Sequence, residues 1–322
     1  MTGLLLIQLG TPDAPTATAL KPYLRQFLSD PRVIEDQGWK WKFILNFLIL
    51  RSRPAASAEK YGRIWDAKTG SPLFHYTVRQ TELLKAEFPN NPVRFGMIVG
   101  NPPLRQTIEE MVASGVTKLI ALPMFPQYSA TSFASATDSL FNALTKLRRV
   151  PAVRVVPPYY DHPAYIDALE AVLRDDLAKL SWQPEHFVIS FHGIPQSYVA
   201  KGDPYPSDVE RTKIELVKRM GWQPGQWTQT YQSRFGRSEW LKPYTDDVLT
   251  DLAKNGTKRV YVALPGFTVD CLETIDEIGN ESREVFEHAG GEHLKSGTCL
   301  NDHPKWIEGM ARILRDEGHG WL

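Results

Sequence analysis

One histidine and a row of glutamates are the residues of this sequence whose types and spacing fit metal chemistry. His192 ends an apolar run and is followed at once by Gly193, and three carboxylates recur at every fourth position further along: Glu273, Glu277 and Glu281. Residues four apart lie on one face of a helix, so these carboxylates would form a row. A neutral imidazole together with carboxylates suits a divalent first-row metal ion. Because these residues form no closed ligand set, the pattern predicts a site that passes the ion on.

Each part of this pattern also has an ordinary structural interpretation. A histidine at the end of a buried strand is about as often a hydrogen-bonded core residue as a functional one. The acidic row would equally suit the solvated face of an amphipathic helix, with Leu272, Ile275 and Ile278 on the other side. However, like charges four apart cost on the order of a few tenths of a kcal/mol, and Gly279 inside the helix costs roughly 1 kcal/mol relative to alanine. These costs favour function and predict a backbone irregularity such as a π-bulge near Gly279.

Composition limits the kinds of protein this can be. The chain has 322 residues, which suits two domains of about 150 residues, and 42% of its residues are hydrophobic. Lys and Arg total 37, as do Asp and Glu, so the basic excess of a nucleic-acid-binding protein is missing. The two cysteines, Cys271 and Cys299, are too few for a cysteine-ligated iron–sulfur cluster, which needs about four thiolates, and they fit a reducing cytoplasm.

Four short apolar runs, each ending in a Gly or Pro turn, organise the chain: residues 4–12, 118–126, 187–195 and 260–267. Runs without polar alternation suit strands that are covered on both faces, as in parallel sheets. Amphipathic stretches between the runs predict helices at residues 101–114, 164–180 and 207–220. This alternation predicts an α/β fold with parallel sheets flanked by helices.

The runs also pair as an internal repeat. Two strings recur in the same order: LGTP at 9–12 matches HGIP at 192–195, and ALPMF at 121–125 matches ALPGF at 263–267. The repeat predicts two similar Rossmann-like domains, residues 1–158 and 159–322, with the active-site cleft between them. Ligands of open α/β sheets sit outside the carboxyl ends of the strands, where His192 falls. In the first half Leu9 takes the matching place. Neither the LGTP turn nor the HGIP turn fits the pattern of a phosphate-binding loop.

Two further apolar runs bear on localisation. The run at the start of the chain is short and lacks a basic flank, so it predicts a buried strand and not a signal peptide. The run from Trp39 to Leu50 has 12 residues, whereas a bilayer span needs about 20. Trp39 and Trp41 beside lysines are typical of an interface-seeking helix, and a core helix fits equally well. The sequence therefore favours the cytoplasm, with peripheral contact to the inner membrane through this segment left open.

Several longer sequence motifs resemble those of the ferrochelatase family, and they occur in the same order. They include LGTPDAP, RSRPAASAEKYGRIW, PQYSATS, SFHGIPQSYVAKGDPYP, YQSRFGRSEWLKPYTD and LPGFTVDCLETIDEIG, and they run from Leu9 to about Glu281. The resemblance implies insertion of Fe²⁺ into protoporphyrin IX, which forms protohaem, releases two protons and completes haem biosynthesis. Porphyrin and ferrous iron are then substrates, and neither a tightly bound cofactor nor an iron–sulfur cluster is implied.

The resemblance also implies roles for single residues. His192 matches the active-site histidine and Glu273 the active-site glutamate, while Glu277 and Glu281 continue the acidic row; these four are the candidate metal contacts. Six residues resemble porphyrin contacts, with one of the two arginines meant: Leu9, Arg51, Arg53, Tyr61, Ser71 and Trp240. A neutral His192 would accept pyrrole protons, and Glu273 would be an early iron ligand or a second base. Which face of the ring receives the metal stays open.

Other functions share parts of this pattern. Coproporphyrin is the alternative substrate, although the motif wording is closer to Gram-negative members and favours protoporphyrin. A cobalt-inserting tetrapyrrole chelatase would share the fold and the histidine but usually lacks KGDPYP together with DCLET. A porphyrin or haem carrier would need no acidic row. Cys271 stands where animal members carry a histidine, which puts a metal-ligand role for residue 271 in doubt, and the sequence leaves the oligomeric state open.

Overall fold

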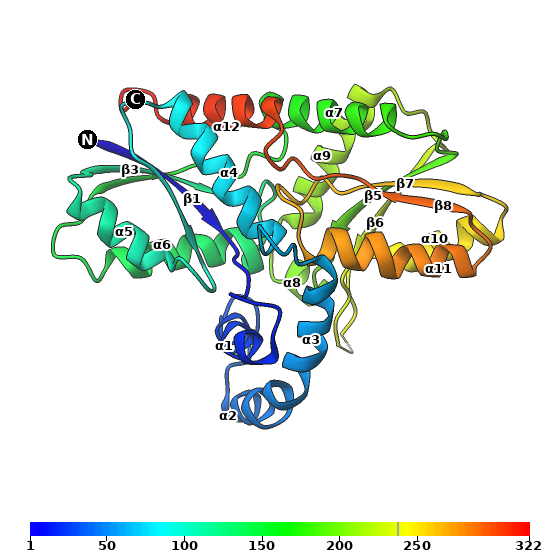
Figure 1. Cartoon of the computed structure of the whole chain (residues 1–322), viewed down its shortest axis with the longest axis horizontal. Coiled ribbons are helices and arrows are strands. Elements are labelled where there is room, and N and C mark those ends of the chain that lie inside the picture. Colours follow the sequence, from blue (N-terminus) through cyan, green and yellow to red (C-terminus); the bar gives the residue numbers. More distant parts are fainter. Residues whose placement is uncertain (237) are drawn as a thin grey trace. The chain divides into compact units, whose positions relative to one another are not determined.

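The computed structural model describes residues 1–236 and 238–322, which form two compact units (Figure 1). Unit 1 comprises Met1–Pro158 together with Met310–Leu322, and unit 2 comprises Tyr159–Gly309. The sequence-based division runs the second domain on to residue 322, whereas the packing assigns residues 310–322 to unit 1. Arg154 explains this assignment, because its guanidinium donates to main-chain carbonyls of the C-terminal segment at 3.0 and 2.8 Å.

Unit 1 is built on a parallel sheet of four strands in the order β2-β1-β3-β4. Its strands are β1 (Thr2–Gln8), β2 (Val93–Met97), β3 (Lys118–Pro123) and β4 (Ala152–Val155). Every residue of β1 is buried, as expected for an interior strand that helices cover on both faces. The interior strands β1 and β3 match two of the predicted apolar runs, while the edge strands β2 and β4 each carry an arginine and were not predicted.

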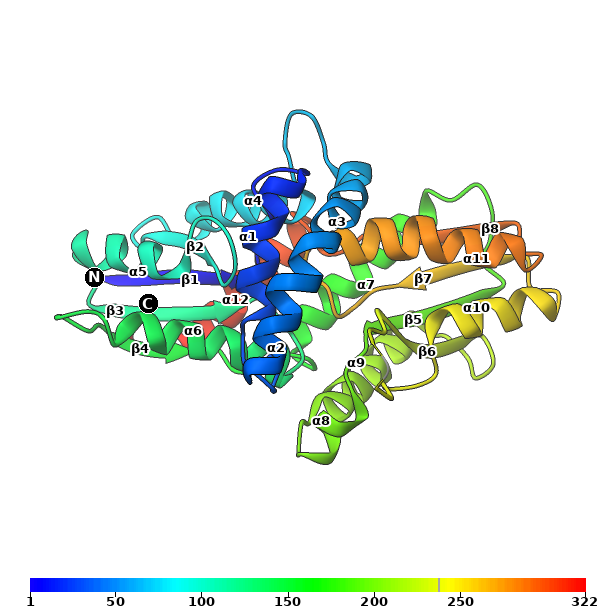
Figure 2. The ribbon, with the colours of Figure 1, turned by 90° about the horizontal axis from the view of Figure 1, so that it is seen from below.

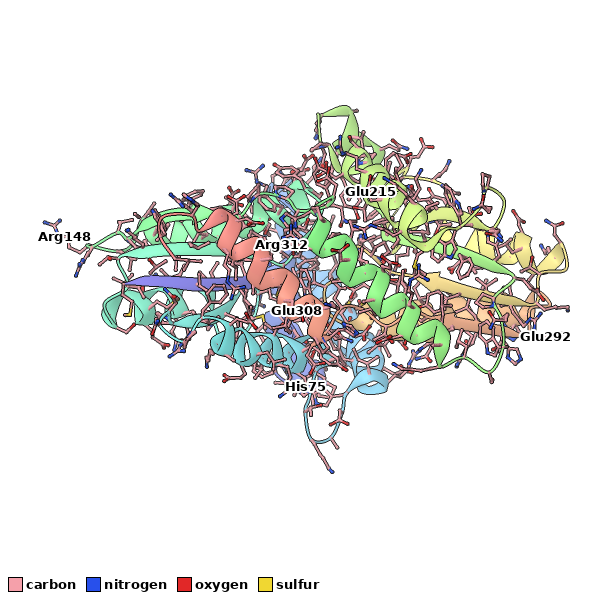
Figure 3. The ribbon with its side chains drawn as sticks, turned by 90° about the horizontal axis from the view of Figure 1, so that it is seen from above. His75, Arg148, Glu215, Glu292, Glu308 and Arg312 are labelled. Atoms are coloured by element: carbon pink, nitrogen blue, oxygen red, sulfur yellow. The ribbon has the colours of Figure 1, made fainter. Side chains whose placement is uncertain are left out.

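Helices cover both faces of this sheet. On one side α5 (Leu104–Ala113) and α6 (Ser135–Leu144) pack around Leu5 and Ile7 of β1, and α6 follows a short π-helix, η2 (Ala130–Ala134). On the other side lies α12 (Pro304–Glu317), while α4 (Pro72–Glu87) packs beside β2 (Figure 1). Figure 3 shows Glu308 and Arg312 on the outward face of α12, which is amphipathic.

A helical extension follows β1 in unit 1. It consists of α1 (Ala17–Leu28), α2 (Trp39–Phe43), the π-helix η1 (Ile44–Ile49) and α3 (Leu50–Ile64). The run from Trp39 to Leu50 has a buried side and an exposed side. Leu45 is 3% exposed and packs in a core with α1, whereas Trp39 is 76% exposed. Phe47 and Leu48 are also exposed. Within the described ranges, no helix is long and apolar enough to cross a membrane.

Unit 2 repeats the sheet of unit 1. Its parallel strands run in the order β6-β5-β7-β8, with β5 (His186–His192), β6 (Trp227–Gln232), β7 (Arg259–Ala263) and β8 (His293–Ser296). In each unit the first strand lies inside, between the second and the third, and the fourth forms an edge. The prediction of two similar Rossmann-like domains with parallel sheets is therefore confirmed.

The helices of unit 2 also lie on both faces of its sheet (Figure 1, Figure 2). On one side are α7 (Pro163–Ala178) and α9 (Tyr205–Met220), and on the other are α10 (Thr245–Lys254), the π-helix η3 (Glu273–Ser282) and α11 (Arg283–His288). The short α8 (Gln196–Ala200) follows β5. The helices predicted at 101–114, 164–180 and 207–220 are confirmed within a few residues as α5, α7 and α9.

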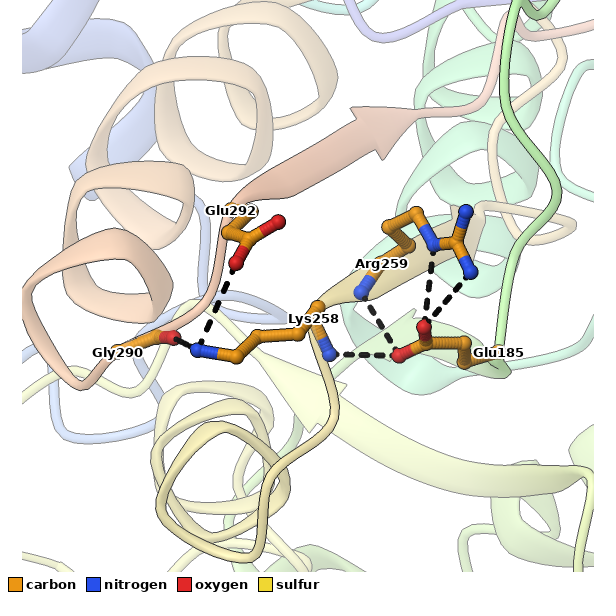
Figure 4. Close-up of polar contacts among 5 residues, drawn as sticks. All are labelled: Glu185, Lys258, Arg259, Gly290 and Glu292. Atoms are coloured by element: carbon orange, nitrogen blue, oxygen red, sulfur yellow. Dashed lines mark hydrogen bonds and ion pairs between the residues drawn. The ribbon is translucent and has the colours of Figure 1, made fainter.

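A carboxylate ties β5 to β7 at the sheet end opposite His192 (Figure 4). Glu185 accepts hydrogen bonds from the main-chain N–H of Lys258 at 2.6 Å and from Arg259 Nε and Nη2 at 3.1 and 2.9 Å. The Lys258 side chain in turn donates to the carbonyl of Gly290 at 2.7 Å. The N–H of Lys258 and the Arg259 side chain lower the pKa of Glu185, because they stabilise its charged form.

We expect Glu185→Gln to destabilise unit 2 in a pH-dependent way. The folded pKa lies below the unfolded value of about 4.3, so the stabilisation is present above that pH and is lost as the pH falls through the folded pKa. The side chain is partly exposed, so the loss at pH 7 should be only about 1 kcal/mol. Urea unfolding at pH 7 and pH 3.5 measures it, with the exposed Glu284→Gln as control. An equal loss at both pH values would contradict the linkage.

Candidate active site

His192 is the last residue of β5, an interior strand of unit 2, and its side chain is half-buried. Its Nδ1 lies 2.7 Å from the carbonyl oxygen of Gly193. A carbonyl only accepts, so Nδ1 carries the proton and Nε2 of the neutral ring is left as a proton acceptor. A Cβ at residue 193 would lie 3.0 Å from the carbonyl of Gln232 and 3.2 Å from the ring of Trp240, so the tight turn favours glycine.

Trp240 lies close to the histidine. The centroids of the two rings are 6.4 Å apart, and the planes are tilted by 48°. The segment of Trp240 is held by main-chain bonds to the turn after β5, where Leu241 N–H donates to the carbonyl of Ile194 at 3.0 Å. The predicted porphyrin contact Trp240 and the predicted catalytic His192 therefore belong to one local structure.

The predicted irregularity in the acidic helix is larger than a single bulge. Residues 273–282 form the π-helix η3. With hydrogen bonds to the fifth residue, a π-helix has slightly more than four residues per turn, so side chains spaced by four lie nearly above one another. Glu273, Glu277 and Glu281 are all half-buried on this element. Gly279 is not sterically required, because a Cβ there would make only ordinary contacts at 3.6 and 3.7 Å.

Glu277 is held by the end of the neighbouring strand β6. Its Oε1 accepts from the main-chain N–H of Ser233 and its Oε2 from the Ser233 hydroxyl, each at 2.6 Å. Ser233 has φ +66°, a left-handed conformation that is uncommon outside glycine and that often marks functional sites. Burial raises the pKa of Glu277; the Ser233 bonds and His192 oppose the rise, and Glu273 adds to it. Glu277 therefore interacts electrostatically with both His192 and Glu273.

Hydrogen bonds of Asp270 anchor the loop before η3. Asp270 accepts from the Thr274 hydroxyl at 3.0 Å and from Asn301 Nδ2 at 2.6 Å. Cys271 and Cys299 are free and buried, and burial raises the pKa of both thiols well above the ordinary value. Over residues 1–236 and 238–322, no group of three or more His, Cys, Asp or Glu side chains is placed to hold a metal ion.

The predicted arginine and tyrosine contacts lie on α3 of unit 1. Arg51 is exposed, with its guanidinium 5.7 Å from the ring centre of Phe47. Arg53 is partly buried, and this burial lowers its pKa. Tyr61 is half-buried and makes an edge contact with Tyr23 of α1, with ring centres 6.3 Å apart.

The remaining predicted contacts of unit 1 follow β1. Leu9 is half-buried just beyond the strand. The next residues bond to other parts of unit 1: Tyr23 of α1 donates to the carbonyl of Gly10 at 3.4 Å, and Thr11 donates at 2.8 Å to Oγ of Ser71, a predicted contact. Ser71 is only 3% exposed, so its hydroxyl is engaged with Thr11.

Two residues that hold the acidic row were not singled out from the sequence, Gln232 and Ser233. Both lie in the string YQSRFGR, which carried part of the family resemblance. Gln232 ends β6 and Ser233 follows it; the sequence of this strand, WTQTYQ, is mostly polar and gave no apolar run. A positive φ at a serine has no sequence signal of its own.

The family model for ferrochelatase matches residues 1–317. The chain belongs to the ferrochelatase family. A ferrochelatase of Rhodopseudomonas palustris strain BisB5 is 46% identical over 324 residues, covering 99% of this chain and 94% of that relative. A ferrochelatase of Chromobacterium violaceum is 47% identical over 329 residues, covering 99% of this chain and 89% of the relative.

Solved chelatase structures share the fold of this ferrochelatase family member. SirB from Bacillus subtilis with Fe³⁺ superposes with a TM-score of 0.56 at 14% identity, over 79% of this chain and 95% of SirB. The Deinococcus radiodurans protein DR2241, described as similar to chelatases, gives a TM-score of 0.52 at 13% identity, over 97% of this chain and 54% of DR2241. At these identities the likeness concerns the fold alone.

Proposed function

We propose that this ferrochelatase family member inserts Fe²⁺ into protoporphyrin IX to form protohaem, with release of two protons. Its relatives named ferrochelatase match along nearly the whole chain, which supports the reaction. The observation that carries the proposal is the local group in unit 2: His192 with Nε2 free to accept a proton, beside the half-buried carboxylates of Glu273 and Glu277. Ferrous iron is a substrate here and not a resident cofactor.

His192 is the proposed acceptor of the pyrrole protons. The bond from Nδ1 to the Gly193 carbonyl fixes the ring and directs Nε2 away from its own main chain. A planar porphyrin points its nitrogen lone pairs inward, so binding energy from the rest of the ring must distort it before a base and a metal ion reach those nitrogens. A positioned neutral imidazole is an efficient general base.

The acidic row is proposed to serve iron, protons or both. Glu273 stands at the start of η3 as an early iron ligand or a second base, and Glu277 and Glu281 continue from it. The raised pKa of Glu277 brings its titration closer to neutral pH, which suits a group that takes a proton and hands it on. Carboxylate oxygens equally suit a divalent ion in transit.

Six side chains are proposed to contact the porphyrin: Leu9, Arg51, Arg53, Tyr61, Ser71 and Trp240. Trp240 is supported by its position beside the His192 ring. The guanidinium of an arginine is suited to pair with a propionate carboxylate, and Arg51 is exposed. Ser71 is the least accessible of the six, since its hydroxyl is buried against Thr11.

The segment from Trp39 to Leu50 is proposed to touch a membrane surface, which would place this cytoplasmic protein at the inner membrane. Trp39, Phe43, Phe47 and Leu48 are more than half or about half exposed along α2 and η1. Two lysines on the same segment would favour anionic headgroups. A poorly soluble porphyrin would then enter from, and haem leave toward, the bilayer.

An anaerobic assay of porphyrin metallation tests the reaction and its substrate. We expect ferrous iron to be inserted into protoporphyrin IX faster than into coproporphyrin III, followed by absorbance. A higher rate with coproporphyrin would give the reaction to the alternative substrate. Preference for cobalt and a corrin precursor would indicate the other chelatase class, and tight porphyrin binding without turnover would indicate a carrier.

We expect His192→Ala to lower kcat by at least about 100-fold, the range seen when a positioned general base is removed. The side chain is half-buried at a strand end, so circular dichroism and thermal unfolding should stay close to wild type. His288→Ala, exposed on α11, is the matched control and should keep full activity. Wild-type turnover by His192→Ala would remove this residue from the reaction.

Exchange of two exposed apolar side chains tests the membrane proposal. The double variant Phe47→Ser, Leu48→Ser should bind vesicles of 30% anionic phospholipid several-fold more weakly than wild type in co-sedimentation at low salt. Phe141→Ser on α6 is the control, because Phe141 is similarly exposed but lies outside the segment. Absence of wild-type binding at low salt, or equal loss in the control, would count against a specific membrane surface.

A further inference from the structure

Gln232 is the last residue of β6 and is nearly inaccessible, with 4% of its surface exposed. It pairs in register with His192 in the parallel ladder of β5 and β6. Register partners in neighbouring strands project from the same face of a sheet. The carbonyl of Gln232 also accepts from Gly193 N–H at 2.8 Å, so this residue is bonded to the turn that follows the histidine.

The side-chain amide of Gln232 connects three elements. Its Oε1 accepts from the Ser190 hydroxyl of β5 at 2.9 Å. Its Nε2 donates to the main-chain carbonyl of Glu273 at 3.1 Å and lies 3.5 Å from Oε2 of Glu277. The two oxygens near Nε2 can only accept, so a flipped amide would bring acceptors together and the orientation is fixed.

The Ser190 hydroxyl lies in a group of buried hydroxyls. It lies 2.9 Å from Thr245 Oγ1, which donates to Thr230 Oγ1 at 2.9 Å. All of these groups are buried. The Ser190 hydroxyl that donates to Oε1 is therefore enclosed among buried hydroxyls and fixes the amide of Gln232 from the side of the sheet.

The hydrogen bond from Gln232 to Glu273 lies at the first residue of the π-helix η3. Extra donors reach the first carbonyls of η3 from outside it: Gln232 Nε2 reaches that of Glu273, and Ser296 Oγ reaches that of Thr274 at 2.8 Å. The π-helix is a rare conformation that needs support from its surroundings. An amide that holds its first carbonyl and contacts the Glu277 carboxylate one turn later sets both the place of the helix and the direction of that side chain.

We infer that Gln232 is a positioning residue of the proposed reaction: it fixes the start of η3 and the Glu277 carboxylate relative to the strand that carries His192. The inference rests on the proposed function, and it adds a residue that does not touch the reacting atoms. Gln232 acts through Glu277 and Glu273, while Ser233 supplies the stronger bonds to the same carboxylate.

Steady-state kinetics of Gln232→Met, which keeps the length and removes both polar atoms, tests the inference. We expect kcat/KM for Fe²⁺ to fall about tenfold, while the Kd for protoporphyrin from fluorescence quenching changes less than twofold. The control is Gln229→Met on the same strand, where the amide donates to Tyr231 Oη at 2.9 Å and points away from the acidic row; it should behave as wild type. Wild-type kcat/KM for Gln232→Met would overturn the inference.

A double-mutant cycle with Glu277→Gln separates positioning from general stability. If Gln232 acts through Glu277, adding Gln232→Met to Glu277→Gln should cost less than about twofold further. Full additivity would mean that Gln232 acts independently of the Glu277 carboxylate and would overturn the inference. If Gln232→Met fails to fold, Ser190→Ala releases only Oε1 of the amide and should lower kcat/KM for Fe²⁺ at least twofold; unchanged kinetics there would also overturn it.

Amide hydrogen exchange tests the contact between Gln232 and η3 without an activity measurement. Amides of residues 273–282 should exchange faster in Gln232→Met than in wild type and Gln229→Met, and equal exchange in all three would overturn the inference. Wild-type turnover tests the proposed function, whereas the comparison of variants tests Gln232, so the two can fail separately.

Discussion

The parallel pairing of β5 with β6 is the interaction on which the chemistry of unit 2 depends. It sets His192 beside Gln232, and Ser233 then follows where the chain leaves the sheet. A half-buried carboxylate needs donors to remain charged, and the end of β6 supplies them to Glu277 from one main-chain N–H, one hydroxyl and one amide. A one-residue slip of this register would turn the Gln232 side chain to the other face of the sheet, away from the Glu277 carboxylate.

The two units share one sheet topology but differ in the residues at the end of the first strand. In both, the first strand lies inside, between the second and the third. Unit 2 ends this strand in an imidazole, whereas the turn of unit 1 carries Leu9 and a hydroxyl pair, Thr11 and Ser71. The repeat therefore preserved the positions at which side chains are presented and changed their chemistry, as expected if function resides in the site and not in the fold.

What the sequence predicted follows the burial of the strands. The four apolar runs correspond to β1, β3, β5 and β7, which are the interior strands of the two sheets. Their neighbours β2, β4, β6 and β8 are edge strands with polar side chains, so periodicity did not reveal them. His192 and the acidic row were singled out as candidates because they end or follow predicted elements. Gln232 and Ser233 were missed because they end an edge strand and act through geometry that only pairing creates.

At Ser233 the backbone conformation and the side-chain hydrogen bond favour different residue types. Its φ of +66° suits glycine, and glycine there would relieve a backbone cost of order 1 kcal/mol. Glycine would keep the N–H that reaches Oε1 of Glu277 but would remove the hydroxyl that reaches Oε2. A hydrogen bond to a charged group is worth roughly 1.5–3 kcal/mol, more than this backbone cost, so the hydroxyl makes serine the better residue here despite its conformation.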